Sequence, residues 1–74
     1  MIAEVQHRQS VFDVALQVFG TAEAAFIVAE KLGCSITDPI EAGSTLEYGI
    51  EEVVDKHVAD YYRKNGIIPT TEIE

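Results

Sequence analysis

The side chains of this chain that could do acid–base chemistry or bind a metal are two histidines, one cysteine and thirteen carboxylates. His7 and His57 lie in different predicted elements, and neither has a carboxylate at the i, i+4 spacing that would form a metal-binding helix face. Cys34 has no CxxC or Cys/His partner spacing, so neither zinc nor redox chemistry is indicated. We therefore expect no metal and no cofactor, with Cys34 acting as a small hydrophobic residue.

The acidic residues offer two pairs that could serve as general acid and base, Glu51 with Glu52 and Asp55 with Asp60. Such carboxylates do chemistry only in a site that also holds a nucleophile or oxyanion-binding groups. No nucleophile and no glycine-rich oxyanion loop accompany them here. The charged faces of helices explain these carboxylates, and we expect that the chain is not an enzyme.

The charge balance and the hydrophobic pattern exclude further classes of protein. Thirteen acidic against five basic side chains give a formal net charge of −8, which nucleic-acid backbones and anionic lipid surfaces repel. No stretch of apolar residues is long enough to span a membrane, and the first ten residues lack the features of a signal peptide. We expect no nucleic acid and no membrane as partners, and a reducing, cytoplasmic location.

The first half of the chain predicts a strand followed by two short helices. Residues 2–6, IAEVQ, form the strand. Ser10 opens a capping-box pattern, and Gly20 ends the first helix, which is apolar almost all round. Thr21 caps the second helix and Gly33 ends it. Because the joint between them is so short, the two helices should form an angled hairpin.

The stretch ITDPIEAGSTLEY should return the chain to the first strand. Pro39 prevents another helix, Gly43 supplies a turn, and STLEY reads as a second short strand. The strands around Val5 and Leu46 are predicted to pair antiparallel, because pairing satisfies their main-chain groups. The result is an α+β unit of β-α-α-β order. Its core is expected to contain the large apolar side chains of the two helices, namely Phe12, Leu16, Phe19, Phe26 and Leu32.

A third helix is predicted in IEEVVDKHVADYYRKNG, starting either near Ile50 or at an Asp55 cap. An apolar arc that includes Ile50, Val54, Val58 and Tyr61 should pack on the rest of the chain, over Ile27. Residues 70–74, TTEIE, are expected to be frayed.

Three side chains are candidates for a protein interface. Ile27 sits among polar residues of the second helix, so something should cover it. Tyr61 and Tyr62 point about 100° apart on a helix, so only one of them can face inward. Tyrosine is enriched at interfaces because it combines apolar area with a polar tip. The alternative is that both tyrosines only pin the helix to the rest of the chain.

The order of residues 5–48 resembles a LysM module: a strand, a hydroxyl-capped helix, a glycine, a second helix ending in EKLG, and a closing strand. Residues 40–46, IEAGSTL, are similar to the family's I-x-P-G-Q-x-L signature. Modules of this family that bind N-acetylglucosamine polymers commonly open with GDT, where this chain has Arg8-Gln9-Ser10. The asparagine of the family's L-N-G turn is likewise replaced, by Leu32 before Gly33.

Both replaced segments flank the groove in which that family holds its glycan. By resemblance, the groove lies between the first strand–helix loop and the second helix–strand loop. Its candidate residues here are Gln9, Ser10, Ile36, Thr37 and Asp38. The alternative is that these residues serve only capping and turn formation.

A narrower resemblance is to small LysM-like proteins of contractile-tailed bacteriophages and prophages, the tail protein X type. It rests on the first helices, VFDVALQVFGTAEAAF, and on the extension VADYYRKNGIIP. It implies a structural component of a tail or baseplate that acts through protein–protein contacts. A module that binds peptidoglycan or N-acetylglucosamine is the alternative.

The resemblance also implies a domain plan and a set of partners. Residues 1–49 would form the LysM-like module, and residues 50–74 a helix and extended tail packed on the same single domain. The expected partners are other tail or baseplate proteins, with peptidoglycan glycan and a second copy of the chain left open. The expected location is the cytoplasm of the producing bacterium and then the virion tail.

Overall fold

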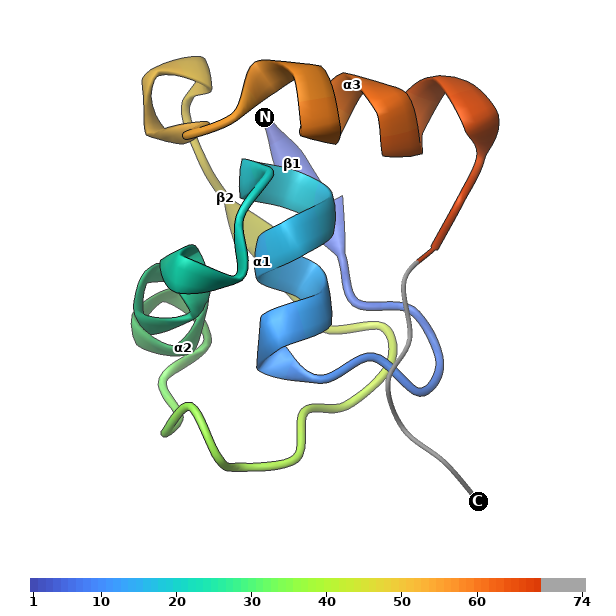
Figure 1. Cartoon of the computed structure of the whole chain (residues 1–74). Coiled ribbons are helices and arrows are strands. Elements are labelled where there is room, and N and C mark those ends of the chain that lie inside the picture. The colour runs from blue at the N-terminus through green and yellow to red at the C-terminus, as the bar shows by residue number, and fades with distance from the viewer. Residues whose placement is uncertain (69–74) are drawn as a thin grey trace.

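The computed structural model describes residues 1–68 of this chain, and the predicted frayed segment 70–74 lies outside them. Over residues 1–68 the fold is α+β, with a two-stranded antiparallel sheet and three α-helices (Figure 1). Two short 3₁₀-helices, η1 and η2, lie between these elements. The elements in chain order are β1 (Ile2–Glu4), α1 (Val11–Phe19), η1 (Ala22–Ala24), α2 (Ala25–Leu32), β2 (Thr45–Glu47), η2 (Ile50–Glu52) and α3 (Lys56–Asn65).

The predicted antiparallel pairing of the two strands is confirmed. Ala3 lies opposite Leu46, with Ile2 and Glu4 on either side of it. The ladder extends beyond the strands, since Val5 N–H donates to the Ser44 carbonyl at 2.8 Å. The ribbon of β1 and β2 lies beside α1, so that Val5 and Leu46 are buried in the core.

The two ends of α1 follow the predicted signals. Ser10 Oγ accepts from the Asp13 N–H, and the Asp13 carboxylate accepts from the Ser10 N–H, so the capping box is formed. Gly20 ends the helix with φ of 83°, a left-handed conformation that favours glycine. The following helical stretch, Ala22–Leu32, is bent by 118° from α1, as the short joint predicted.

The composition of the core differs from the prediction. Of the five large side chains, only Phe19 is fully buried, and Leu16 and Leu32 are partly buried. Phe12 is 44% exposed and Phe26 is 69% exposed. The buried faces of α1, η1 and α2 consist mainly of valines and alanines, namely Val11, Val14, Ala15, Val18, Ala24, Ala25, Val28 and Ala29.

The physical reason for this difference is close approach. Small side chains at the contact let two helices pack closely, and a bulky phenylalanine there would hold them apart. Phe12 and Phe26 each lie one position, about 100°, away from a buried residue of the same helix. They therefore point away from the contact.

The third helix begins at Lys56 with Asp55 as its N-cap, the second of the two predicted starts. Asp55 Oδ1 accepts from the main-chain N–H groups of His57 and Val58, at 3.1 and 3.2 Å. The predicted arc is wrong, because residues 53–55 interrupt the helical period between η2 and α3. Val54 is 67% exposed as a result. The main contact of α3 is with α1 (Figure 1), rather than over Ile27.

Among residues 1–68, no single helix is long and apolar enough to cross a membrane. In the same residues, one bent pair of helical segments, α1 and Ala22–Leu32, has the length and apolar composition of a membrane span.

Candidate functional site

The five predicted groove residues, Gln9, Ser10, Ile36, Thr37 and Asp38, line one groove of about 490 Å³. We call it the α1–loop groove. One wall is the start of α1 with the two residues before it, and the other wall is the loop that follows α2. Phe12, Pro39 and Ile40 complete the lining. The structure therefore brings together residues that lie about 25 positions apart in the sequence, as the resemblance to a LysM module implied.

The buried Gln9 side chain holds the fold together and offers little to a ligand. This side chain is 4% exposed and links three segments of the chain. Its Oε1 accepts from the Gln6 N–H at 2.9 Å, and its Nε2 donates to Gln17 Oε1 at 2.7 Å. The main-chain N–H of Gln9 donates to the Gln6 carbonyl at 3.3 Å. This network fixes the turn that leads from β1 into α1.

The polar groups of Ser10 are also engaged. Its N–H and its Oγ both lie within hydrogen-bond distance of Asp13 Oδ2, at 2.8 and 2.9 Å. Asp13 is buried, and a buried carboxylate is tolerated because such donors satisfy it. Ser10 is thus the helix cap that the sequence predicted, at the edge of the groove.

The opposite wall is a turn held by its own side chains. Asp38 Oδ2 accepts from the Ser35 N–H at 2.9 Å, and the Asp38 N–H donates to the Ser35 carbonyl at 3.0 Å. The hydroxyls of Ser35 and Thr37 lie 3.3 Å apart. These contacts support capping and turn formation as the role of these polar residues, rather than glycan binding.

An exposed aromatic ring in this groove was missed in the sequence. Phe12 was assigned to the core, yet it lines the groove with Ile36, Pro39 and Ile40. The signal available was its place in the first turn of α1, two positions after the Ser10 cap, where the helix has no preceding turn to cover it. The groove can therefore offer apolar contact and the face of one ring, with the Asp38 carboxylate at its side.

The candidate interface residues do not form one surface. Tyr61 and Tyr62 contact each other edge to face, with ring centroids 6.0 Å apart, and Tyr61 is the exposed member of the pair. Ile27 lies on α2, which is well separated in Figure 1 from the C-terminal half of α3 that carries the tyrosines. One partner patch would have to reach around α1 to contact all three.

Each candidate acid–base residue either makes a contact within the fold or is exposed to solvent. Asp55 caps α3, and Asp60 forms an ion pair of 2.6 Å with Arg63. Glu52 accepts from the Gly49 N–H at 2.9 Å and pairs with Lys31 at 3.2 Å. The Gly49 hydrogen bond, followed by Lys31, lowers the pKa of the Glu52 carboxyl from its ordinary value of 4.5.

Within residues 1–68, no group of three or more His, Cys, Asp or Glu side chains is placed to hold a metal ion. Both His7 and His57 are exposed.

No family model matches this chain, and no curated protein sequence and no solved structure matches it either.

Proposed function

We propose that this chain is a non-enzymatic assembly component of a phage or prophage tail or baseplate, built on a LysM-like fold and working through protein–protein contacts. The observation that carries the proposal is the amount of apolar surface left in the open. Five large side chains of the described residues are more than half exposed after Met1, namely Ile2, Phe26, Ile50, Val54 and Tyr61.

These side chains lie on β1, on α2, on η2, just before α3 and on α3, so more than one face offers apolar contact to a partner. A small domain has little core to spare, and apolar patches beyond single scattered residues commonly mark sites of contact with other proteins. Phe26 on α2 and Val54 just before α3 are the most exposed of those that lie outside the sheet. The acidic surface supports a protein partner over an anionic wall polymer or a nucleic acid.

The order β1, α1, α2, β2 supports the LysM-like part of the proposal, with η1, η2 and α3 as additions to that plan. The main chain at Arg8 supports it as well. Arg8 has φ of 68°, the left-handed region that favours glycine, and glycine is the residue that the family's GDT segment carries at this position. Residue 8 thus keeps a glycine-like conformation without the glycine.

Co-expression tests the assembly role. The chain is produced together with the products of its neighbouring genes, and each is tagged in turn. We expect it to co-purify with a tail or baseplate protein, and we expect Phe26→Asp to reduce the recovered partner while Glu30→Ala on the same helix does not. A chain that purifies alone from every combination would contradict the proposal.

A glycan-binding module stays the second candidate, because the α1–loop groove holds its five predicted residues together with the exposed ring of Phe12. Sugar rings present apolar faces that can lie against an aromatic side chain. Against this, the polar groups of Gln9, Ser10 and Asp38 are used within the fold.

An NMR titration with chitooligosaccharides at millimolar concentration separates the two candidates. We expect no saturable binding. Saturable shifts confined to residues 9–12 and 36–40, lost in Phe12→Ala, would replace the assembly proposal by the wall-binding one.

A further inference from the structure

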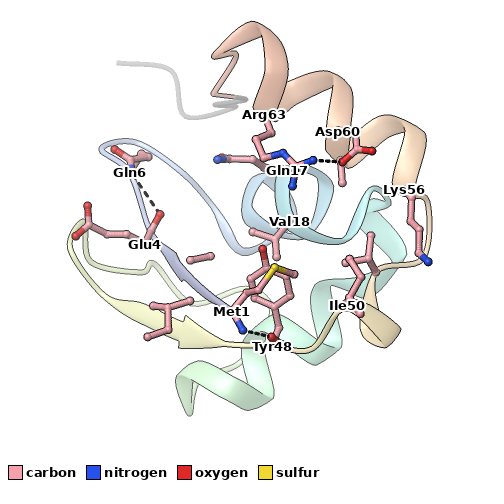
Figure 2. Close-up of a pocket in the computed structure, with 14 residues that line it drawn as sticks. Met1, Glu4, Gln6, Gln17, Val18, Tyr48, Ile50, Lys56, Asp60 and Arg63 are labelled. Carbon is pink, nitrogen blue, oxygen red and sulfur yellow. Dashed lines mark hydrogen bonds and ion pairs between the residues drawn. The ribbon is translucent and has the colours of Figure 1, made fainter.

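A second hollow lies on another side of α1, between β1 and α3 (Figure 2). We call it the β1–α3 groove. It measures about 440 Å³ and is lined by each residue of β1, by Val18 of α1, and by Lys56, Ala59 and Arg63 of α3, among others. No residue of β2 lines it. The groove therefore follows the edge of β1 that faces away from β2.

That edge of β1 carries main-chain groups without a strand partner. Tyr48 N–H donates to the Met1 carbonyl, and Val5 N–H donates to the Ser44 carbonyl, both at 2.8 Å, so the odd-numbered residues of this segment face β2. Hydrogen-bonded and non-hydrogen-bonded pairs alternate in an antiparallel ladder. Ile2 and Glu4 thus turn their N–H and C=O groups outward.

Within residues 1–68, one hydrogen bond reaches these outward groups: Gln6 Nε2 donates to the Glu4 carbonyl over a long distance of 3.4 Å. An exposed row of such groups is a template for another strand. Main-chain groups at this spacing are matched by the main chain of an extended peptide.

The far wall limits what can enter. In Figure 2, α3 stands on the side of the groove opposite β1, and Val18 of α1 lies between them. Neighbouring strands lie about 4.8 Å apart, so a single extended segment can pair with β1 beneath α3. The sheet of a second folded copy would bring a further strand that α3 obstructs.

The charges set the order of residue types along the entering segment. Glu4 lies at one end of the groove in Figure 2, and Lys56 lies toward the other end, beside Ile50. Neither side chain has an ion pair within the described part of the chain, whereas Arg63 is held by Asp60. A base near Glu4 and an acid near Lys56 would be complementary to them.

We propose that the β1–α3 groove binds an extended segment of a partner protein as a third strand, antiparallel to β1. The segment carries a basic residue opposite Glu4, a β-branched apolar residue opposite Ala3, and an acidic residue toward Lys56. The apolar side chain of the segment lies on the same face of the sheet as the Ala3 side chain, which packs against the core. There it contacts Val18 and Ala59. The inference rests on the proposed assembly role for the identity of its partner.

The capped peptide acetyl-Thr-Lys-Val-Thr-Glu-amide tests the site directly in an NMR titration of the whole chain. We expect saturable shifts at residues 1–4, at Val18 and along residues 56–63. Methylating the main-chain nitrogen of the second threonine, which should donate to β1, should weaken binding about fivefold, the effect of one net hydrogen bond. Exchanging the lysine and the glutamate should weaken binding as well.

A matched pair of variants tests the edge from the protein side. Glu4→Pro removes an N–H that points into the groove, whereas Thr45→Pro removes one from the opposite edge of the same sheet. We expect Glu4→Pro to weaken peptide binding about fivefold or more and Thr45→Pro to leave it within about twofold. The N-methylated peptide keeps the test valid if a proline variant fails to fold.

The outcomes separate the site from the assembly role. Absent shifts, shifts away from the groove, or equal binding of the N-methylated peptide would each overturn the strand site. Peptide binding without any co-purifying tail protein would uphold the site and count against the assembly role. Co-purification that survives Glu4→Pro would uphold the role and overturn the site as its contact.

Discussion

Helices α1 and α3 are nearly equal in length and are held in place in opposite ways. Six of the nine residues of α1 are buried, whereas α3 has ten residues and none of them is buried. The sequence of α1 is apolar almost all round, which is typical of a helix covered on most sides. That of α3 is amphipathic, and its inner side chains, such as Val58 and Tyr62, remain half-buried.

The difference shows that α3 is positioned by its start as much as by its side chains. The Phe19 carbonyl, at the end of α1, accepts from the N–H groups of both Val54 and Asp55, at 2.9 and 3.0 Å. Gly20 packs directly against the Asp55 main chain. The last residues of α1 therefore serve two purposes: Phe19 fills the core, and the turn at Gly20 receives α3.

The largest effect should come from removing the side chain that anchors α1. Phe19 is fully buried and meets Tyr48 edge to face, with ring centroids 5.5 Å apart. We expect Phe19→Ala to lower the free energy of unfolding by about 3–5 kcal/mol, much of the total for a small domain. Chemical denaturation followed by circular dichroism measures this change.

Phe26→Ala is the matched control, since it removes the same side chain from an exposed position on α2. Its effect should lie within about 0.5 kcal/mol, as for other surface substitutions. Equal losses for the two variants would contradict the burial of Phe19 and the exposure of Phe26.

The second prediction concerns the point where α1 receives α3. A Cβ at Gly20 would overlap the Asp55 carbonyl oxygen, and the left-handed φ adds its own strain. We expect Gly20→Ala to cost about 2–5 kcal/mol, the sum of about 1–2 for the conformation and about 1–3 for overpacking. In hydrogen exchange, the amides of α3 should lose more protection than those of α1.

Gly33→Ala isolates the conformational part. Gly33 ends α2 with a similar φ of 70°, and nothing lies within 4 Å of its Cβ position. Its cost should be about 1–2 kcal/mol, without selective exposure of α3. If both variants loosen α3 equally, the contact with Asp55 is not what holds that helix.

The same contrast explains what could be predicted from the sequence. Caps and helix ends are local, so Ser10, Gly20 and Gly33 were assigned correctly from residue type and spacing. The pairing of β1 with β2 followed from the order of elements and the need to satisfy the main chain. The face that each helix buries is not local: Phe12 and Phe26 point outward because the α1–α2 contact takes small side chains, which no periodicity in either helix alone encodes.

The candidate sites divide in the same manner. The five groove residues were expected from the resemblance to a LysM module, and the structure places them together. Ile27 and the tyrosine pair were each chosen from the pattern of their own helix, and the contact of α3 with α1 places them apart. The β1–α3 groove needed the position of α3, which depends on a main-chain contact with Phe19 that has no sequence signature.

The smallest effect should come from the ion pair that ties the connection before α3 to α2. Glu52 of η2 pairs with Lys31 of α2, and both side chains are partly exposed. The pKa of Glu52 is lowered from 4.5, first by the Gly49 N–H and then by Lys31, so the folded state favours the carboxylate. Its contribution to stability is complete above pH about 4.5, the unfolded value, and is lost as the pH falls through the lower folded value.

Melting temperatures from pH 7 to pH 3 test this contribution through a difference, because other carboxylates titrate in the same range. Glu52→Gln should melt a little below the unmodified chain at pH 7, and the two curves should converge below pH about 4. Glu51→Gln is the control, since the Glu51 carboxylate has no hydrogen bond or ion pair among the described residues. A gap between Glu52→Gln and the unmodified chain that persists unchanged at pH 3 would show that Glu52 acts there through packing, and that α3 is held without help from this charge.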